Sequence, residues 1–257
     1  MRLNLNADLG ESFGPWRMGD DAGLLDVVNS ANVACGQHAG DPLVMRRTVI
    51  AASGQGVEIG AHPGYADLQG FGRRPVQLSD EELAATLHYQ IGALAGIATA
   101  CGAPLSHVKP HGALNNLACE DDAVARTVVA AVAACRPDLI LLAPVFSELA
   151  NAARQAGQPV ALEVFADRAY TASGHLVPRR LPGAVHEASE TCVRQVLGML
   201  EAGGVLTIDG DVLPCDFQSV CVHGDTAHAV RTARDVRAAV QAAGHELVAL
   251  SDTLRHR

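Results

Sequence analysis

Short apolar runs alternate with longer helix-like segments along most of the chain. Nine of these runs have the length and the aliphatic, β-branched content of strands. They are Leu3–Asp8, Ala31–Cys35, Val57–His62, His107–Lys109, Leu139–Ala143, Val160–Phe165, Val205–Ile208, Val220–His223 and Glu246–Leu250. Strand–helix alternation is typical of parallel strands joined by crossover helices, so we predict an α/β protein with a parallel sheet.

Helix-start signals support this alternation. Segment 41–54 opens with Asp-Pro, the order of an N-cap residue and a first-turn proline. Ser79 and Glu82 have the S-x-x-E spacing of a capping box, in which each side chain bonds a free amide of the first turn. Asp225 is expected to cap a helix over residues 225–244, where apolar residues recur at helical spacing.

The distribution of polar residues indicates which parallel architecture forms. No linker, low-complexity segment or change in composition interrupts the chain, so we expect residues 1–257 to form one barrel-type domain. Hydrophobic residues make up 49% of the chain but aromatic residues only 4%, which predicts a core of Ala, Val and Leu. Polar residues follow nearly every predicted strand. This favours a distorted (β/α) barrel over a doubly wound sheet, because the strand ends of a barrel meet at one face.

The first predicted strand carries polar residues at alternate positions. Asn4, Asn6 and Asp8 point to one face of it, and Glu11 follows. Three polar side chains on a core face are costly unless they line a cavity. The alternative is an edge strand with one wet face.

Candidate functional side chains follow the other strands as well. They are Asn32, Cys35 and His38; His62, Tyr65, Asp67, Arg73 and Arg74; Lys109, His111 and Asn116; Glu163, Asp167, Arg168 and Tyr170; and His223 with Asp225. Each is weak evidence alone, since a histidine before glycine or proline is often an ordinary loop residue. Their joint occurrence at successive strand ends indicates one shared cleft.

Lys109 is the single lysine of the chain, among 19 lysine and arginine residues. It stands in the motif V-K-P-H-G, where a strand gives way to a loop. A compact ammonium group whose pKa responds to burial suits proton transfer or carbonyl polarisation better than a guanidinium does. The alternative is a compositional bias toward arginine that left one lysine by chance.

Two kinds of chemistry fit these residues. Asp8, His62 and His111 are candidate ligands of a divalent metal ion with a position left open for water. Without a metal, Asp8 is a candidate general base, while Lys109 or His111 polarises a carbonyl group. We therefore predict Asp8, His62, Lys109 and His111 as catalytic residues.

The other strand-end residues are predicted to bind substrate. Arginines suit a carboxylate or a phosphate, because a guanidinium can donate two parallel hydrogen bonds. The predicted substrate-binding set is Asn6, Glu11, Asn32, His38, Arg73, Arg74, Asp167, Arg168 and His223, with Arg179 a further candidate for an anion. The sequence contains neither the phosphate-binding motif G-x-x-x-x-G-K-[ST] nor a dinucleotide fingerprint.

Charge and cysteine content narrow the possible partners. A formal net charge of -9 argues against nucleic acid, which favours clustered basic residues. No apolar stretch is long and uninterrupted enough for a membrane span. Seven cysteines, an odd number without a C-x-x-C pair, and no recognisable signal peptide suggest free thiols in a reducing cytoplasm.

Six motifs in order along the chain resemble those of the LamB/YcsF family. They are N-A-D-L-G-E, N-V-A-C-G-Q-H-A-G-D, G-A-H-P-G-Y-A-D-L-Q-G-F-G-R-R, V-K-P-H-G-A-L, E-V-F-A-D-R-A-Y and C-V-H-G-D-T. The resemblance implies a barrel like those of glycoside hydrolases and deacetylases. It also implies a share in the ATP-dependent opening of 5-oxo-L-proline to L-glutamate, with release of ADP and phosphate. Two partner proteins, subunits B and C, are implied as well.

One residue departs from the family pattern. The family usually has tyrosine after P-H-G-A-L, whereas this chain has Asn115. Two other functions remain open at this point. One is a free-standing metal-dependent amidohydrolase or deacetylase; the other is a non-catalytic protein that binds substrate for partner enzymes.

Overall fold

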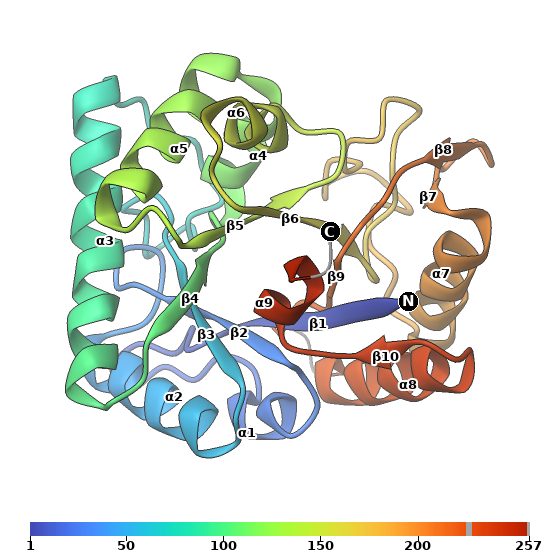
Figure 1. Cartoon of the computed structure of the whole chain (residues 1–257), viewed down its shortest axis with the longest axis horizontal. Helices are drawn as coiled ribbons and strands as arrows, with labels where there is room; N and C mark the ends of the chain where they lie inside the picture. The colour runs from blue at the N-terminus through green and yellow to red at the C-terminus, as the bar shows by residue number, and fades with distance from the viewer. Residues whose placement is uncertain (225–227, 256–257) are drawn as a thin grey trace.

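Seven parallel strands close into a barrel in the computed structural model, which describes residues 1–224 and 228–255 (Figure 1). In spatial order they are β1 (Arg2–Leu9), β2 (Ser30–Ala34), β3 (Glu58–His62), β4 (Leu105–Val108), β5 (Ile140–Pro144), β6 (Val160–Phe165) and β9 (Ser219–Cys221). Pairing of β1 with β9 closes the ring. The predicted parallel α/β barrel is confirmed, with seven strands in the closed ring.

Helices surround the barrel (Figure 1). They are α1 (Asp21–Leu25), α2 (Pro42–Gly54), α3 (Asp80–Ala100), α4 (Gly112–Glu120), α5 (Asp122–Cys135), α6 (Glu148–Ala156), α7 (Ser189–Ala202), α8 (Ala229–Ala242) and α9 (Leu250–Leu254). Two predicted caps are confirmed. Asp41 accepts hydrogen bonds from the amides of Leu43 and Val44, and both halves of the Ser79–Glu82 capping box form. The predicted Asp225 cap lies outside the described residues.

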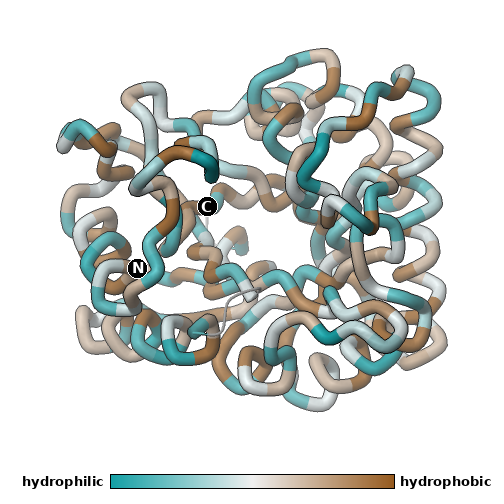
Figure 2. Tube along the Cα trace, turned by 180° about the vertical axis from the view of Figure 1, so that it is seen from behind, coloured by the Kyte–Doolittle hydropathy of each residue, from teal (hydrophilic) through white to brown (hydrophobic). Residues whose placement is uncertain are grey.

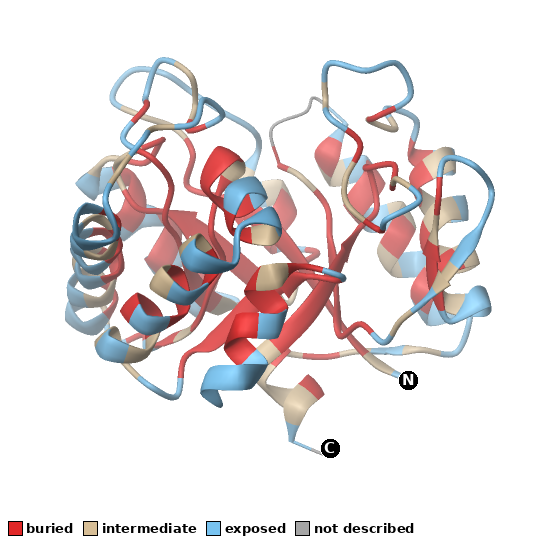
Figure 3. Ribbon diagram, turned by 90° about the horizontal axis from the view of Figure 1, so that it is seen from above, coloured by how far each residue is buried: buried red, intermediate tan, exposed pale blue. Residues whose placement is uncertain are grey.

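The core lies between the strands and the helices. Hydrophobic and hydrophilic positions alternate along the surrounding helices (Figure 2), and the strands of the barrel are buried while many of the connecting loops are exposed (Figure 3). On β1, Leu3, Leu5 and Leu9 belong to the hydrophobic core. Asn4 and Asn6 are also fully buried, because β1 lies between β2 and β9. The alternative of an edge strand with a wet face is therefore wrong.

Two predicted strands differ in the structure. The run predicted as Val205–Ile208 forms β7 (Gly204–Leu206), which pairs antiparallel with β8 (Val212–Pro214) in a separate two-stranded sheet. The run predicted as Glu246–Leu250 forms only β10 (Glu246–Leu247), parallel to the start of β1, and Leu250 begins α9. Apolar content indicated strands in both places, but it carries no information on strand partners or direction.

Two further expectations can be compared with the structure. All seven cysteines are free thiols, as predicted. Within residues 1–224 and 228–255, no helix combines the length and the apolar character needed to cross a membrane.

Candidate active site

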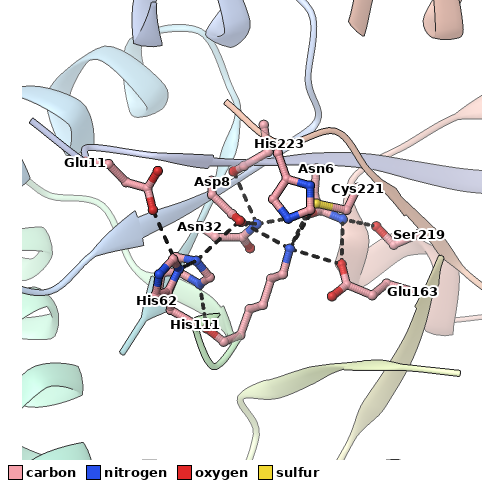
Figure 4. Close-up of polar contacts among 12 residues, drawn as sticks. Asn6, Asp8, Glu11, Asn32, His62, His111, Glu163, Ser219, Cys221 and His223 are labelled. Atoms are coloured by element: carbon pink, nitrogen blue, oxygen red, sulfur yellow. Dashed lines mark hydrogen bonds and ion pairs between the residues drawn. The ribbon is translucent and has the colours of Figure 1, made fainter. Parts of the chain in front are cut away.

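The carboxyl ends of the barrel strands converge on a cavity of about 380 Å³. Asn6 and Asp8 come from β1, Glu163 from β6 and Cys221 from β9, and their side chains point toward one another (Figure 4). The cavity is lined by, among others, Asp8, His62, Arg73, Lys109, His111, Asn115, Arg168, His175, Arg179, Arg180 and His223. Strand ends that are far apart in sequence therefore form one site.

Lys109 lies at the floor of this cavity and is 2% exposed. Its Nζ atom is 3.1 Å from Asp8 Oδ1 and 3.2 Å from Glu163 Oε2. The same nitrogen lies 3.1 Å from Cys221 Sγ and 3.3 Å from Asn6 Oδ1. We refer to Asn6, Asp8, Lys109, Glu163 and Cys221 as the lysine cluster.

The charges of the lysine cluster shift each other's pKa values. Burial alone would lower the pKa of Lys109, but the carboxylates of Asp8 and Glu163 outweigh burial and hold it well above its usual value. Burial would raise the pKa of Asp8, and His62 and Lys109 together hold it well below its usual value. Burial raises the pKa of Glu163 despite the neighbouring Lys109. Asp8 is therefore the firmly ionised partner of Lys109.

A network of buried amides holds Asp8 in place. Asn32 Nδ2 donates to Asp8 Oδ1 at 2.9 Å and to Asn6 Oδ1 at 2.8 Å. His107 Nε2 lies 2.9 Å from Asn32 Oδ1, and its Nδ1 lies 2.7 Å from Ser106 Oγ. Burial lowers the pKa of His107 to about 3, so the ring is neutral and can donate to Asn32. His107 was not predicted as a site residue, although it stands only two positions before Lys109.

Three histidines and one glutamate gather beside the lysine cluster; we call Glu11, His38, His62 and His111 the histidine cluster. All four are buried, and each offers a ligand atom within 4.8 Å of the others. His111 Nδ1 is 2.9 Å from His62 Nε2 and 3.7 Å from Glu11 Oε1. His62 Nε2 is also 3.4 Å from Asp8 Oδ2. This set of nitrogen and carboxylate ligands could hold a metal ion.

The local backbone brings His111 to this position. The chain turns sharply after Lys109, and Gly112 has a φ of 55° at the start of α4. A Cβ atom there would lie 2.6 Å from the carbonyl oxygen of Gly72, so the close approach requires glycine. The turn places His111 Nε2 2.8 Å from the carbonyl oxygen of Phe71.

The predicted arginines occupy different surroundings. Arg73, Arg168 and Arg179 line the cavity, and so does Arg180, which was not predicted. Arg168 is buried and donates to the carbonyl oxygens of Val177 and Ala184, and burial lowers its pKa to about 10. The side chain of Arg74 is 63% exposed and forms an ion pair with Asp67.

His223 and Asp167 form a pair at the cavity wall. His223 Nδ1 lies 2.8 Å from Asp167 Oδ2, and the imidazole stacks on Phe165 with ring centroids 5.4 Å apart. Burial would raise the pKa of Asp167, but His223 and nearby arginines lower it on balance. Both predicted residues therefore lie at the same site as Lys109.

Several residues of the site were not predicted. Cys221 contacts Lys109, and Ser219 Oγ accepts a hydrogen bond from Asn6 Nδ2 at 2.8 Å. Asn115 is buried against the cavity, and its Oδ1 has no hydrogen-bond partner within the described chain. The one sequence signal was the departure of Asn115 from the family pattern.

Comparison with known proteins agrees with these observations. A model of the LamB/YcsF family matches residues 3–255. The chain belongs to the LamB/YcsF family. A member from Azoarcus sp. (strain BH72), described as the A subunit of 5-oxoprolinase, is 57% identical over 252 residues, which cover 98% of both chains. The chain is therefore similar along nearly its whole length to a component of a 5-oxoprolinase.

Solved structures show the same fold. The lactam utilization protein from Thermus thermophilus superposes with a TM-score of 0.91 at 44% identity, covering 97% of this chain and all of that one. A mutant of the peptidoglycan deacetylase PdaC from Bacillus subtilis superposes with a TM-score of 0.50 at 14% identity, over 98% of this chain and 88% of that one. The second likeness concerns the fold alone and agrees with the expected deacetylase-like barrel of this LamB/YcsF member.

Proposed function

We propose that this chain is the component of an ATP-dependent 5-oxoprolinase in which the lactam ring of 5-oxo-L-proline is opened to L-glutamate. One observation carries the proposal. A buried Lys109–Asp8 pair lies at the floor of a cavity, in a chain 57% identical along its length to the A subunit of a 5-oxoprolinase. The proposed partners are 5-oxoprolinase subunits B and C. The free thiols favour a cytoplasmic location.

The proposed overall reaction consumes 5-oxo-L-proline, ATP and two water molecules, and forms L-glutamate, ADP and phosphate. A five-membered lactam is a stable amide, so its opening needs coupling to another reaction. Transfer of the terminal phosphoryl group of ATP to the amide oxygen would supply this coupling, because phosphate is a better leaving group than oxide. Water then attacks the former carbonyl carbon and the ring C–N bond breaks, which frees the amine and leaves a γ-glutamyl phosphate; a second water hydrolyses this acyl phosphate to L-glutamate and phosphate. ATP is a co-substrate of the complex in this proposal.

The lysine cluster supplies the charges that this step needs. Lys109 remains protonated and can stabilise negative charge that develops on the amide oxygen. Asp8 remains ionised and lies between Lys109 and His62, where it can take the proton of the attacking water. His62 Nε2 lies 3.4 Å from Asp8 Oδ2 and 2.9 Å from His111 Nδ1, so both rings lie close to the place where Asp8 would take that proton.

The cavity wall offers partners for the rest of the substrate. Arg73 and Arg179 line the cavity and suit the substrate carboxylate, because a guanidinium can bind it through two hydrogen bonds. Asn115 Oδ1 lacks a partner within the described chain, and a buried acceptor of this kind suits the ring N–H of a lactam. A tyrosine in its place would offer a hydroxyl group farther from the backbone.

The histidine cluster favours a second candidate, a free-standing metal-dependent amidohydrolase. Glutamate release from 5-oxo-L-proline separates the two functions. The assay uses the chain alone and with subunits B and C, each with and without ATP. Turnover that requires ATP and both partners is the expected result. Turnover by the chain alone would favour the amidohydrolase, and no turnover in any mixture would contradict the substrate assignment.

A further inference from the structure

The hydrogen bonds of His62 and His111 determine which ring nitrogen carries the proton. His62 Nδ1 lies 2.7 Å from the carbonyl oxygen of Lys109, and His111 Nε2 lies 2.8 Å from that of Phe71. A carbonyl oxygen only accepts hydrogen bonds, so both of these nitrogens must be protonated. In neutral rings, the remaining nitrogens, His62 Nε2 and His111 Nδ1, each carry a lone pair.

These two lone pairs face each other. His62 Nε2 and His111 Nδ1 are 2.9 Å apart, and Asp8 Oδ2 lies 3.4 Å from His62 Nε2 (Figure 4). With both rings neutral, three acceptors converge in a buried place that a bound cation can hold together. Histidine ligands of metal ions typically donate their other ring N–H to a backbone carbonyl, as both rings do here.

Glu11 supplies a third ligand atom at a suitable distance. Its Oε1 lies 3.7 Å from His111 Nδ1. Ligands bound tetrahedrally to Zn²⁺ at about 2.0–2.2 Å are roughly 3.3 Å apart. The separations of 2.9 and 3.7 Å in the histidine cluster bracket that spacing.

His38 takes a different role. Its ring is stacked on that of His111, with centroids 3.8 Å apart and an angle of 5° between the planes. The lone pair of an imidazole lies in the ring plane, so one ion cannot lie in the planes of two stacked rings. His38 Nε2 lies 3.3 Å from Glu11 Oε1 and can orient that carboxylate instead.

We propose that His62 Nε2, His111 Nδ1 and Glu11 Oε1 bind one divalent transition-metal ion of the zinc class. His38 positions Glu11, and Asp8 lies beside the ion. Three protein ligands leave a position open toward the cavity, as in hydrolytic sites. The inference concerns the same cavity as the proposed lactam opening and in that respect rests on the proposed function, but metal binding can be measured without any substrate.

Metal binding by the purified full-length chain tests the proposal. The chain is equilibrated with Zn²⁺, dialysed against metal-free buffer and analysed for zinc. We expect about one ion per chain in the wild type, and a loss of at least ~100-fold in affinity for His62→Gln and His111→Gln. His38→Gln should lose ~10–100-fold, as expected for a group that orients a ligand. His88→Gln, on the exposed face of α3, is the matched control and should bind as the wild type does.

A second measurement uses only the wild-type chain, so its result does not depend on whether the variants fold. Co²⁺ is added to the wild-type chain, and its visible absorption reports the number and type of ligands. A four- or five-coordinate spectrum that Zn²⁺ abolishes is expected. The wild-type chain retaining no zinc, or His111→Gln retaining as much as the wild type, would overturn the metal site and leave a shared proton between the histidines. Stoichiometric zinc without lactam turnover in the complex would contradict the proposed function but not the site.

Discussion

The lysine cluster and the histidine cluster adjoin each other on the cavity floor but differ in how their polar groups are paired. In the lysine cluster, one ammonium group lies within 3.3 Å of four acceptors, Asn6, Asp8, Glu163 and Cys221. In the histidine cluster, two ring nitrogens, His62 Nε2 and His111 Nδ1, face one another at 2.9 Å. The chain supplies the cation of the first cluster, whereas the proposed metal ion is the cation of the second.

This difference indicates a separate role for the cation of each cluster. A cation built into the chain is present throughout the reaction cycle and fixes the ionised state of Asp8. A bound cation can be exchanged and can activate water. The adjacency of the two gives the cavity positive charge at two neighbouring points, which suits an amide oxygen and a water molecule that must react with each other.

Removal of Lys109 is expected to have the largest effect. Lys109→Met leaves Asp8 buried without its cation, and breaking a buried pair in this way costs about 3–5 kcal/mol of unfolding free energy. Urea denaturation at neutral pH measures the change. Arg126→Met, which removes an exposed ion pair with Asp122, is the control and should cost less than about 1 kcal/mol. Equal losses in the two variants would contradict the lysine cluster as described.

Crowding the network beneath Asp8 is the next test. A Cβ atom on Gly60 would lie 2.2 Å from the ring of His107, which supports Asn32. Gly60→Ala should therefore destabilise the fold by about 1–3 kcal/mol. Gly96→Ala in α3, where the added Cβ meets nothing within 4 Å, is the matched control and should be neutral or stabilising. A neutral Gly60→Ala would show that His107 can move without consequence.

Acid should weaken the same network. The pKa of His107 falls from about 6.5 in the unfolded chain to about 3 in the folded one, so the unfolded state binds more protons between these values. The stability contribution of neutral His107 is complete above about pH 6.5 and is lost as the pH falls toward about 3. The slope is about 1.4 kcal/mol per pH unit. His107→Asn should show a correspondingly shallower dependence in denaturation at pH 7 and pH 5; an unchanged slope would contradict this.

The smallest effect is expected at Glu163. Its pKa is raised by burial, whereas that of Asp8 is lowered, so Asp8 is the main counterion of Lys109. Glu163→Gln keeps the shape of the side chain and should cost only about 1 kcal/mol, measured by urea denaturation. A loss as large as that of Lys109→Met would show instead that Glu163 carries the charge balance.

Sequence alone predicted the barrel and the face that carries the site, because alternation and strand-end polarity are local properties. It also indicated Lys109, since a single lysine at a strand end is visible without a structure. The residues that contact Lys109 were harder to predict from the sequence. Cys221 contacts the lysine only because β9 pairs with β1 and closes the ring. Local sequence patterns do not determine the order of strands in a sheet.

The histidine cluster also shows this limit of prediction from sequence alone. Sequence reasoning grouped Asp8 with His62 and His111, because all three lie at or just after the ends of predicted strands. Glu11 lies beyond the end of β1, on a loop whose path depends on tertiary packing, and the structure brings it to His111 and His38. The antiparallel pairing of β7 with β8 was missed for a similar reason, since direction depends on the partner strand.

The central claim is that the cavity floor opens the lactam. The most direct test is glutamate formation from 5-oxo-L-proline and ATP by the chain with subunits B and C, comparing Asp8→Asn with Asp122→Asn on the exposed surface of α5. Thermal denaturation verifies that both variants fold. We predict a loss of roughly 10²–10⁴-fold in turnover for Asp8→Asn, as for removal of a general base, and wild-type turnover for Asp122→Asn. Equal turnover by the two folded variants would contradict the account.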